Sequence, residues 1–397
     1  MRIAILSDLH LGFHAFEQDS YDNADEAMDK ALDSDLIIIA GDIFDSRSPR
    51  TAVWNNAIRI LIKPLLKSSG IRLIHSTKEI KEISKRTLSS IPVIAIHGTH
   101  ERKGMDANAV ETLENAGILI HLHKQSVVFE KNGVKVAIHG MSGVPERTAK
   151  TELEEWNPQP VPNCYNILVL HQSIDPFVYS PLEPPSIKLN ELPRGFDVII
   201  DGHIHGTSMS RINDSDLIIV GSTIVTQLEK SEAGAKKGIY RIDFEKNNKR
   251  IEFIPLENSR EFFFEDVIIS GSMRQRIEDV LRKILSRGFV KPPIVKMKII
   301  GKESDMIDQE LKDLERAYSD QANLIFVKQI ESPEVMEKIE FLRNLREQKI
   351  SIEEIGLNLL TKNLDELSFG NAFDHLWAFD FLSQNKTEDL FNQLVKS

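Results

Sequence analysis

The sequence predicts an α/β fold in which mixed sheets are flanked by helices, followed by a small α+β unit and a helical C-terminal tail. Short apolar strands alternate with helical patterns over about the first 255 residues. The pair Asn132-Gly133, between two strand-like runs, is typical of a tight hairpin, so part of the sheet structure is expected to be antiparallel. The pattern changes after about Glu257, and we expect three domains, at residues 1–257, 258–331 and 332–397.

The first domain contains short runs of apolar residues that suit buried strands. These expected strands are residues 3–7, 36–40, 93–97, 118–122, 136–140, 167–171, 198–200 and 217–221. The segments between them place apolar residues three and four positions apart, as one face of a helix requires. The expected helices are residues 23–32, 52–67, 77–88 and 105–117.

Beyond residue 257, two expected strands, "FFFEDVII" (262–269) and "IVKMKII" (294–300), enclose the helical pattern "MRQRIEDVLRKIL" (273–285). The chain then continues in helical patterns and ends with "IEEIGLNLLTKNL" and "AFDHLWAFDFL". This last stretch carries more apolar surface than a short terminal segment can bury against itself, so we expect a partner to dock there. Its apolar residues are Phe373, Leu376, Trp377, Phe379, Phe381 and Leu382.

Composition narrows the class of protein. Hydrophobic residues make up 41% and charged residues 27%, as in ordinary globular proteins. The start, "MRIAILSDLH", becomes charged too early for a signal peptide, and no apolar run approaches membrane-spanning length, so we expect a cytoplasmic protein without membrane contact. The single cysteine, Cys164, excludes an internal disulfide and a cysteine-based zinc cluster. The net charge of −11 disfavours an extensive nucleic-acid-binding surface unless bound metal ions or local Lys and Arg clusters offset it.

Polar side chains with metal-binding chemistry follow five of the expected strands. The motifs are "SDLH", "GDIFD", "GTHER", "LHQ" and "GHIHG", which supply Asp8, His10, Asp42, Thr99, His100, His171, His203 and His205. A lone aspartate or histidine after a strand is usually a cap or a packing residue. Ligands of α/β sheets gather at the carboxyl ends of strands, and five such motifs in order therefore predict one shared site.

The residue types indicate the chemistry of this site. A mixture of carboxylate oxygen and imidazole nitrogen suits manganese, iron or zinc, whereas calcium and magnesium prefer oxygen alone. Six or seven ligands are too many for one tetrahedral ion. They suit two ions roughly 3.5 to 4 Å apart that share a bridging carboxylate, an arrangement that activates water against a phosphoester. The sequence thus predicts hydrolysis of a phosphoester.

The five motifs resemble those of the calcineurin-like metallophosphoesterase superfamily, with its pattern D-x-H, G-D, G-N-H-[D/E], H and G-H-x-H. Within that superfamily, "LVLHQSIDPF", the unit starting "NSREFFFEDV" and the helical tail are similar to the double-strand-break repair nucleases called Mre-eleven in archaea and eukaryotes and SbcD in bacteria. The resemblance implies a four-layer-type sandwich with a small α+β capping domain and a helical tail.

The resemblance also implies roles for the site residues. One manganese ion would be held by Asp8, His10, Asp42 and His205, and a second by Asp42, Thr99, His171 and His203, with His100 as the catalytic histidine. The implied activities are 3′-to-5′ exonuclease on duplex DNA and endonuclease on single strands and hairpins. The implied partners are DNA, a Rad-fifty-type ABC ATPase bound by the C-terminal helices, and a second copy paired through residues 52–67 or the following helix.

Two positions depart from the family pattern. Thr99 stands where the family has asparagine, and a hydroxyl is a poorer ligand than an amide oxygen, so the second ion is expected to bind loosely or to take water there. Asp45 stands where some relatives carry histidine. Two alternatives remain open at this point: a small-substrate nucleotide phosphoesterase, and a weakly active scaffold that binds the ATPase.

Histidines outside these motifs are expected to serve packing or the surface. His121 and His123 share the H-x-H spacing but lack a glycine turn. His97 and His139 follow apolar strands, and we expect packing ahead of a role in orienting ligands. The basic runs "KKGIYR" (236–241) and "RNLREQK" (343–349) are expected to be mainly solvated faces, with phosphate contact as the alternative.

Overall fold

The structure is a computed structural model. It describes residues 1–102, 107–178, 187–269, 272–301, 308–330 and 374–383, together with 356–357, 360–361, 364 and 391. The chain divides into two compact units, each with more contacts within itself than with the other. The first contains Met1–Val267, Arg274–Lys298 and Asp308–Val327, and the second contains Ile268–Met273, Ile299–Ile307 and Lys328–Ser397. The three-domain division drawn from the sequence stays a prediction.

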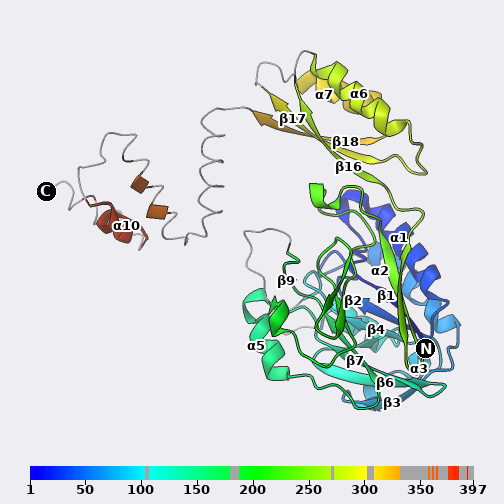
Figure 1. The fold of residues 1–397 in the computed structure, drawn as a ribbon. Coiled ribbons are helices and arrows are strands. Elements are labelled where there is room, and N and C mark those ends of the chain that lie inside the picture. Colours follow the sequence, from blue (N-terminus) through cyan, green and yellow to red (C-terminus); the bar gives the residue numbers. More distant parts are fainter. Residues whose placement is uncertain are drawn as a thin grey trace. The chain divides into compact units, whose positions relative to one another are not determined.

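Two mixed sheets form the body of the first unit (Figure 1). The six-stranded sheet has the order β15 (Lys249–Pro255), β14 (Gly238–Phe244), β1 (Arg2–Leu6), β2 (Leu36–Ala40), β4 (Val93–Ile96), β5 (Ile120–His121). The seven-stranded sheet has the order β12 (Ser208–Ile212), β13 (Ser215–Ile219), β11 (Val198–Asp201), β8 (Tyr165–Leu170), β7 (Val134–Gly140), β6 (Gln125–Lys131), β3 (Arg72–Ser76). In the first sheet β1, β2, β4 and β5 run parallel, and the antiparallel strands β14 and β15 are added at one side. In the second sheet β13, β11, β8 and β7 run parallel, and antiparallel strands are added at both sides.

The two sheets pack face to face through aliphatic side chains. Ile5 and Ile38 of the first sheet share one buried cluster with Ile138 and Ile200 of the second. Burial of each such side chain contributes about 1.5–3 kcal/mol. The other face of the first sheet is covered by α1 (Glu17–Ala31), α2 (Thr51–Leu61) and α4 (Ala109–Asn115). The other face of the second sheet is covered by α5 (Glu146–Trp156). The expected four-layer α/β arrangement is therefore confirmed.

The Asn132-Gly133 hairpin is also confirmed. Both residues have positive φ, 52° and 79°, and they join β6 to β7 with Lys131 opposite Val134. Paired positive φ angles match the right-handed twist of the strands, and asparagine followed by glycine adopts them with little strain.

The prediction of one continuous helix at residues 77–88 is wrong. The segment forms a 3-10 turn at Ile80–Glu82, becomes extended at Ile83, and then forms the short helix α3 (Lys85–Leu88). The Ser84 hydroxyl accepts a hydrogen bond from the backbone N–H of Arg86 and so starts a new helix at that point. Strand β3 was not expected, because its side chains are mostly exposed and give no apolar run.

After β15 the chain forms a three-stranded sheet of order β16 (Phe262–Ile268), β17 (Ile294–Gly301), β18 (Asn323–Ile330). Helices α6 (Met273–Leu285) and α7 (Asp308–Ala317) belong to the same region, and the sequence had predicted β16, α6 and β17 but not α7 or β18. In the C-terminal segment the structure describes α10 (His375–Ser383). Residue Phe373 and the basic run 343–349 lie outside the described residues.

The smaller elements complete the described part of the chain. The remaining strands are β9 (Ile174–Asp175) and β10 (Ile187–Lys188), and the further 3-10 helices are His14–Phe16, Lys63–Leu66, Leu189–Glu191 and Lys230–Glu232. Among the described residues, no helix combines the length and apolarity that crossing a membrane would require.

Candidate metal centre

Five loops at the carboxyl ends of parallel strands carry the predicted site residues. Three leave the first sheet after β1, β2 and β4, and two leave the second sheet after β8 and β11. Because the two sheets pack face to face, these strand ends meet at one edge of the sandwich. The predicted residues on these loops are Asp8, His10, Asp42, Thr99, His100, His171, His203 and His205.

The backbone of this edge is strained at four of those residues. Asp8, His10, Asp42 and His203 all have left-handed φ angles, of 50°, 44°, 46° and 73°. Each non-glycine residue held in that conformation costs of order 1–3 kcal/mol. Strain of this kind persists where the surrounding structure imposes it, and it concentrates at functional sites. The four residues with left-handed φ angles are therefore all residues that the sequence motifs predict for the site.

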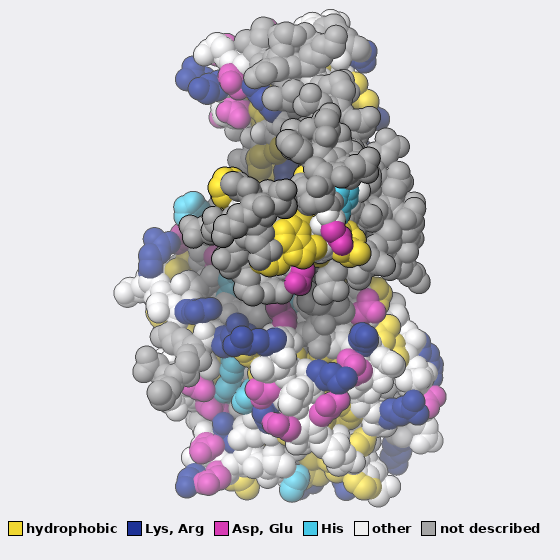
Figure 2. Space-filling view, turned by 90° about the vertical axis from the view of Figure 1, so that its left-hand side faces the viewer, with side chains coloured by type: hydrophobic (Ala, Val, Ile, Leu, Met, Phe, Trp, Pro, Cys, Tyr) yellow, Lys and Arg dark blue, Asp and Glu magenta, His cyan; other side chains and the backbone are white. Residues whose placement is uncertain are grey.

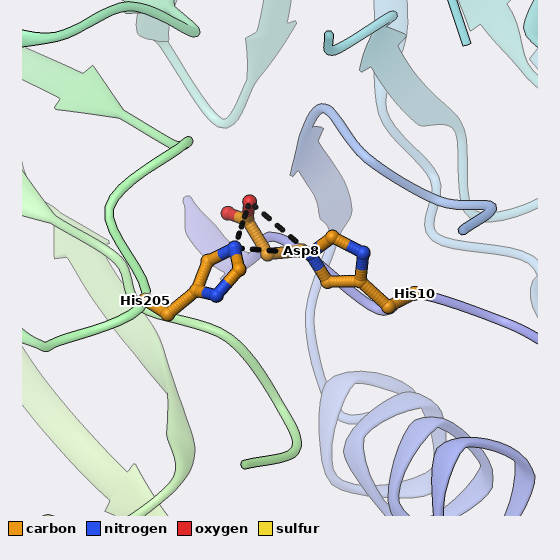
Figure 3. Close-up of side chains that lie close together, drawn as sticks. All are labelled: Asp8, His10 and His205. Carbon is orange, nitrogen blue, oxygen red and sulfur yellow. Dashed lines mark hydrogen bonds and ion pairs between the residues drawn. The ribbon is translucent and has the colours of Figure 1, made fainter. Parts of the chain in front are cut away.

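Asp8, His10 and His205 converge on one point from two separate segments of the chain (Figure 3). The Nε2 atoms of His10 and His205 lie 3.0 Å apart. The Oδ1 atom of Asp8 lies 3.8 Å from the first and 3.5 Å from the second. That oxygen is buried and has no hydrogen-bond partner. A buried carboxylate oxygen without a partner, facing two imidazole nitrogens, fits a bound divalent cation.

In His10, His171 and His205, the ring nitrogen Nδ1 contacts an oxygen atom. The Nδ1 atom of His10 is 3.1 Å from Asp45 Oδ1, and that of His171 is 2.7 Å from the carbonyl oxygen of Ala40. The Nδ1 atom of His205 contacts the hydroxyl of Thr226. A proton fixed on Nδ1 leaves the Nε2 lone pair directed at a cation, which is how proteins orient histidine ligands.

Asp42 and His171 form a second group beside the first, with Asp8 common to both. His171 Nε2 lies 3.2 Å from Asp42 Oδ2. The His203 ring lies 5.4 Å from the His171 ring between centroids. Burial lowers the pKa of His203 to about 3, so its imidazole is neutral and able to bind a metal.

Thr99 and His100 lie against Asp42. The Thr99 hydroxyl donates to Asp42 Oδ2 at 3.3 Å, and the His100 backbone N–H donates to Asp42 Oδ1 at 2.8 Å. In contrast to the buried His10, His171 and His205, the His100 side chain is 42% exposed. Its Nδ1 lies 3.0 Å from the carbonyl oxygen of Asp45. Asp45 thus contacts both His10 and His100.

Glu101 is a site residue to which the sequence analysis gave no role. It is fully buried, and its carboxylate accepts hydrogen bonds from the backbone N–H groups of Phe44, at 2.8 Å, and Gly98, at 2.9 Å. Burial and repulsion from Asp42 raise its pKa to about 8. Glu101 therefore joins the loop after β2 to the loop after β4. Glycine at position 98 lets the loop after β4 lie close to Asp42, because a Cβ there would collide with the Asp42 carboxylate.

The other strand-end histidines pack, as expected. His97 Nδ1 lies 3.0 Å from His121 Nε2, and the His123 ring stacks on His97. His139 lies edge-on against Phe196. Among the described residues, none of these four histidines belongs to a group able to hold a metal ion.

Comparison with known proteins agrees with this geometry. A family model described as calcineurin-like phosphoesterase matches residues 1–207, more than half of the 397 residues. The "DNA double-strand break repair protein Mre11" of Methanopyrus kandleri is 27% identical over 342 residues, which are 79% of this chain and 67% of that protein. The protein of the same name from Methanococcus maripaludis is 27% identical over 337 residues, 79% of this chain and 82% of that protein.

The relatives extend to animals. The mouse "Double-strand break repair protein MRE11" is 26% identical over 309 residues, 68% of this chain and 43% of the mouse protein. The chain thus spans less than half the length of this relative. The predicted resemblance to calcineurin-like metallophosphoesterases and, within them, to double-strand-break repair proteins is confirmed by these matches.

The Glu101 contacts generate a stability prediction. In Glu101→Gln an amide N–H group replaces one acceptor, so one backbone N–H loses its partner. At a pH above the Glu101 pKa of about 8, where the parent side chain is a carboxylate, the free energy of unfolding is expected to fall by about 1–3 kcal/mol. Urea unfolding followed by circular dichroism measures the change. Glu155→Gln, at an exposed position of α5, is the control and is expected to unfold like the parent chain. Equal stability of the two variants would refute the role given to Glu101.

Proposed function

Because the chain belongs to the calcineurin-like phosphoesterase family, we propose that it is a two-metal DNA phosphodiesterase that processes double-strand breaks. The observation that carries this proposal is the convergence of Asp8, His10, Asp42, His171 and His205, from four strand ends, on a buried centre. The names of the similar repair proteins support DNA as the substrate.

We assign the ligands as two sets that share Asp42. Asp8, His10 and His205 would join Asp42 around the first ion; Thr99, His171 and His203 would join it around the second. Asp8 lies in a group with His10 and His205 and also in a group with Asp42 and His171, which supports two adjacent ions. The assignment of Asp42 as the shared ligand comes from resemblance to the family. Two divalent cations, manganese in this proposal, would lower the pKa of a water molecule and stabilise charge on the phosphoryl oxygens.

His100 would be the catalytic histidine. Its exposed ring projects beside buried ligands, with its centroid 4.8 Å from that of His10. The Asp45 carbonyl holds Nδ1, which leaves Nε2 to meet the scissile phosphate and assist the departing oxygen. Asp45 would then set the orientation of His10 and His100 together.

DNA binding would work through the phosphate backbone. Figure 2 shows acidic and basic side chains interspersed over the visible described face, in keeping with the net charge of −11. In the basic run 236–241, Lys237 is buried, so this run is less basic at the surface than its sequence indicates. The bound cations would therefore supply much of the attraction for phosphate. The proposed activities are 3′-to-5′ exonuclease on duplex ends and endonuclease on single strands and hairpins.

Two partners complete the proposal. A Rad-fifty-type ATPase would bind the C-terminal helices, where Leu376 is 66% exposed and Leu382 is 39% exposed on α10. A second copy of the chain would pair through α2 or the helix that follows it. Both partners come from resemblance to the family.

The scaffold alternative keeps one observation in its favour. The Thr99 hydroxyl donates its hydrogen bond to Asp42, so it supplies less to a second ion than the family's amide oxygen would. A chain with one weak metal site would then serve mainly to bind the ATPase.

A cleavage assay separates these alternatives. With manganese, the parent chain is expected to degrade labelled duplex DNA, and His100→Ala is expected to lose about 10²–10⁴-fold in rate while it still binds manganese. His75→Ala, at an exposed histidine of β3, is the control and should cleave at the parent rate. Equally slow cleavage by the parent and His100→Ala would favour the scaffold. Turnover of bis-p-nitrophenyl phosphate alone would favour a small substrate.

Thr99→Asn tests the second metal position. The amide oxygen is expected to tighten binding of the weaker manganese ion about tenfold, a typical size for changes around a metal ligand. Isothermal titration calorimetry measures both affinities. Thr99→Val, similar in shape and without the oxygen, should weaken the same ion. An unchanged second affinity in both variants would show that position 99 does not bind the metal.

Docking of the ATPase is tested by co-purification. Leu376→Asp is expected to reduce the amount of ATPase retained at least tenfold, because a carboxylate in an apolar contact must be desolvated, while cleavage of short DNA continues. Val290→Asp, at an apolar residue that is 82% exposed, is the matched control. Retention of the ATPase by Leu376→Asp at the control level would place the docking site elsewhere.

A further inference from the structure

A buried ion pair contacts the backbone of His205, a proposed metal ligand. Lys237 is 3% exposed and Glu232 is 4% exposed, and Lys237 Nζ donates to Glu232 Oε1 at 2.6 Å. The same ammonium group donates to Ser222 Oγ at 2.9 Å and to the backbone carbonyl oxygen of His205 at 3.2 Å. Lys237 thus fixes the backbone of a proposed metal ligand directly.

Glu232 fixes the other side of His205 through a turn. Its carboxylate accepts backbone hydrogen bonds from Thr226 at 3.2 Å, Gln227 at 2.9 Å and Leu228 at 3.1 Å. Leu228 has a left-handed φ of 52°, so the turn is held in a strained conformation. Thr226, at its start, contacts Nδ1 of His205 through its hydroxyl. One ion pair therefore holds both the backbone carbonyl and the ring of His205.

The small three-stranded sheet supports the same turn. Val225 and Leu228 pack in an apolar cluster with Phe262 and Phe264 of β16. Lys296 of β17 donates to the carbonyl oxygen of Leu228 at 2.9 Å. The turn is therefore also fixed by contacts with β16 and β17.

Net stability is a weak explanation for such a pair. Taking two charges out of water costs several kcal/mol per ion, and apolar residues of similar volume often serve a fold equally well. The pair instead fixes the positions of its neighbours. It makes five hydrogen bonds, to the His205 carbonyl, to the Ser222 hydroxyl and to the turn at 226–228. Partners that orient a metal-bound histidine typically change metal affinity 10- to 100-fold when they are lost.

We propose that Glu232 and Lys237 are positioning residues that hold His205 in its metal-binding orientation, with Thr226 as the contact to its ring. The proposal rests on the proposed function, since it requires His205 to bind a cation. It assigns to the segment 222–237 a role in the affinity of the first metal site.

The test measures manganese binding directly, without DNA. Lys237→Met retains most of the side-chain volume and removes the charge, and it is expected to lower the affinity of the tighter manganese ion at least tenfold by calorimetry. The matched control is Lys78→Met. Lys78 pairs with Glu114 at 3.0 Å, their side chains are 8% and 11% exposed, and neither is a proposed ligand. This control is expected to bind manganese like the parent chain, whatever its loss of thermal stability.

A second pair of variants keeps the test decisive if Lys237→Met folds poorly. Thr226→Val removes the hydroxyl that contacts His205 and leaves the ion pair intact, and it is expected to weaken the same ion, whereas Thr226→Ser is expected to restore binding. Equal manganese affinity of the parent chain, Lys237→Met and Thr226→Val would overturn this inference alone. Failure of the parent chain itself to bind manganese would overturn the proposed function, and this inference with it.

Discussion

The candidate metal centre depends on two aspartates, Asp8 and Asp42, that the fold buries at the edge where two sheets meet. A carboxylate removed from water is costly unless positive charge or hydrogen bonds compensate it. Here backbone N–H groups, hydroxyls and imidazoles surround the two carboxylates, and still one oxygen of Asp8 has no hydrogen-bond partner. The fold has thus concentrated negative charge at a point that a cation would neutralise.

The rest of the first unit can be understood as support for that arrangement. Parallel strands bring the loops together, four of the proposed ligands have left-handed φ angles, and Glu101 joins two of the loops by accepting backbone hydrogen bonds. The ion pair of Glu232 and Lys237 holds the loop that carries His205. Glu101 and the ion pair act through buried hydrogen bonds, which are directional and therefore favour one geometry of the loops.

The sequence predicted that the motif residues lie together, because the signal of each motif is local. Each motif joins an apolar strand to a polar turn, and the order of the motifs along the chain carries the resemblance to the family. The residues that support them were harder to foresee. Glu101 contacts Phe44, 57 positions away, and Lys237 contacts His205, 32 positions away, so no local pattern reveals either contact. The expected helix at 77–88 failed for the opposite reason, because the local cap at Ser84 outweighed the apolar periodicity.

The most direct test of this account is anomalous diffraction from crystals of the protein soaked in manganese. The account predicts two manganese peaks, one within bonding distance of Asp8, His10 and His205 and one within bonding distance of His171 and His203, with Asp42 between them. A single peak, or manganese bound away from these residues, would contradict the assignment of two ions that share Asp42.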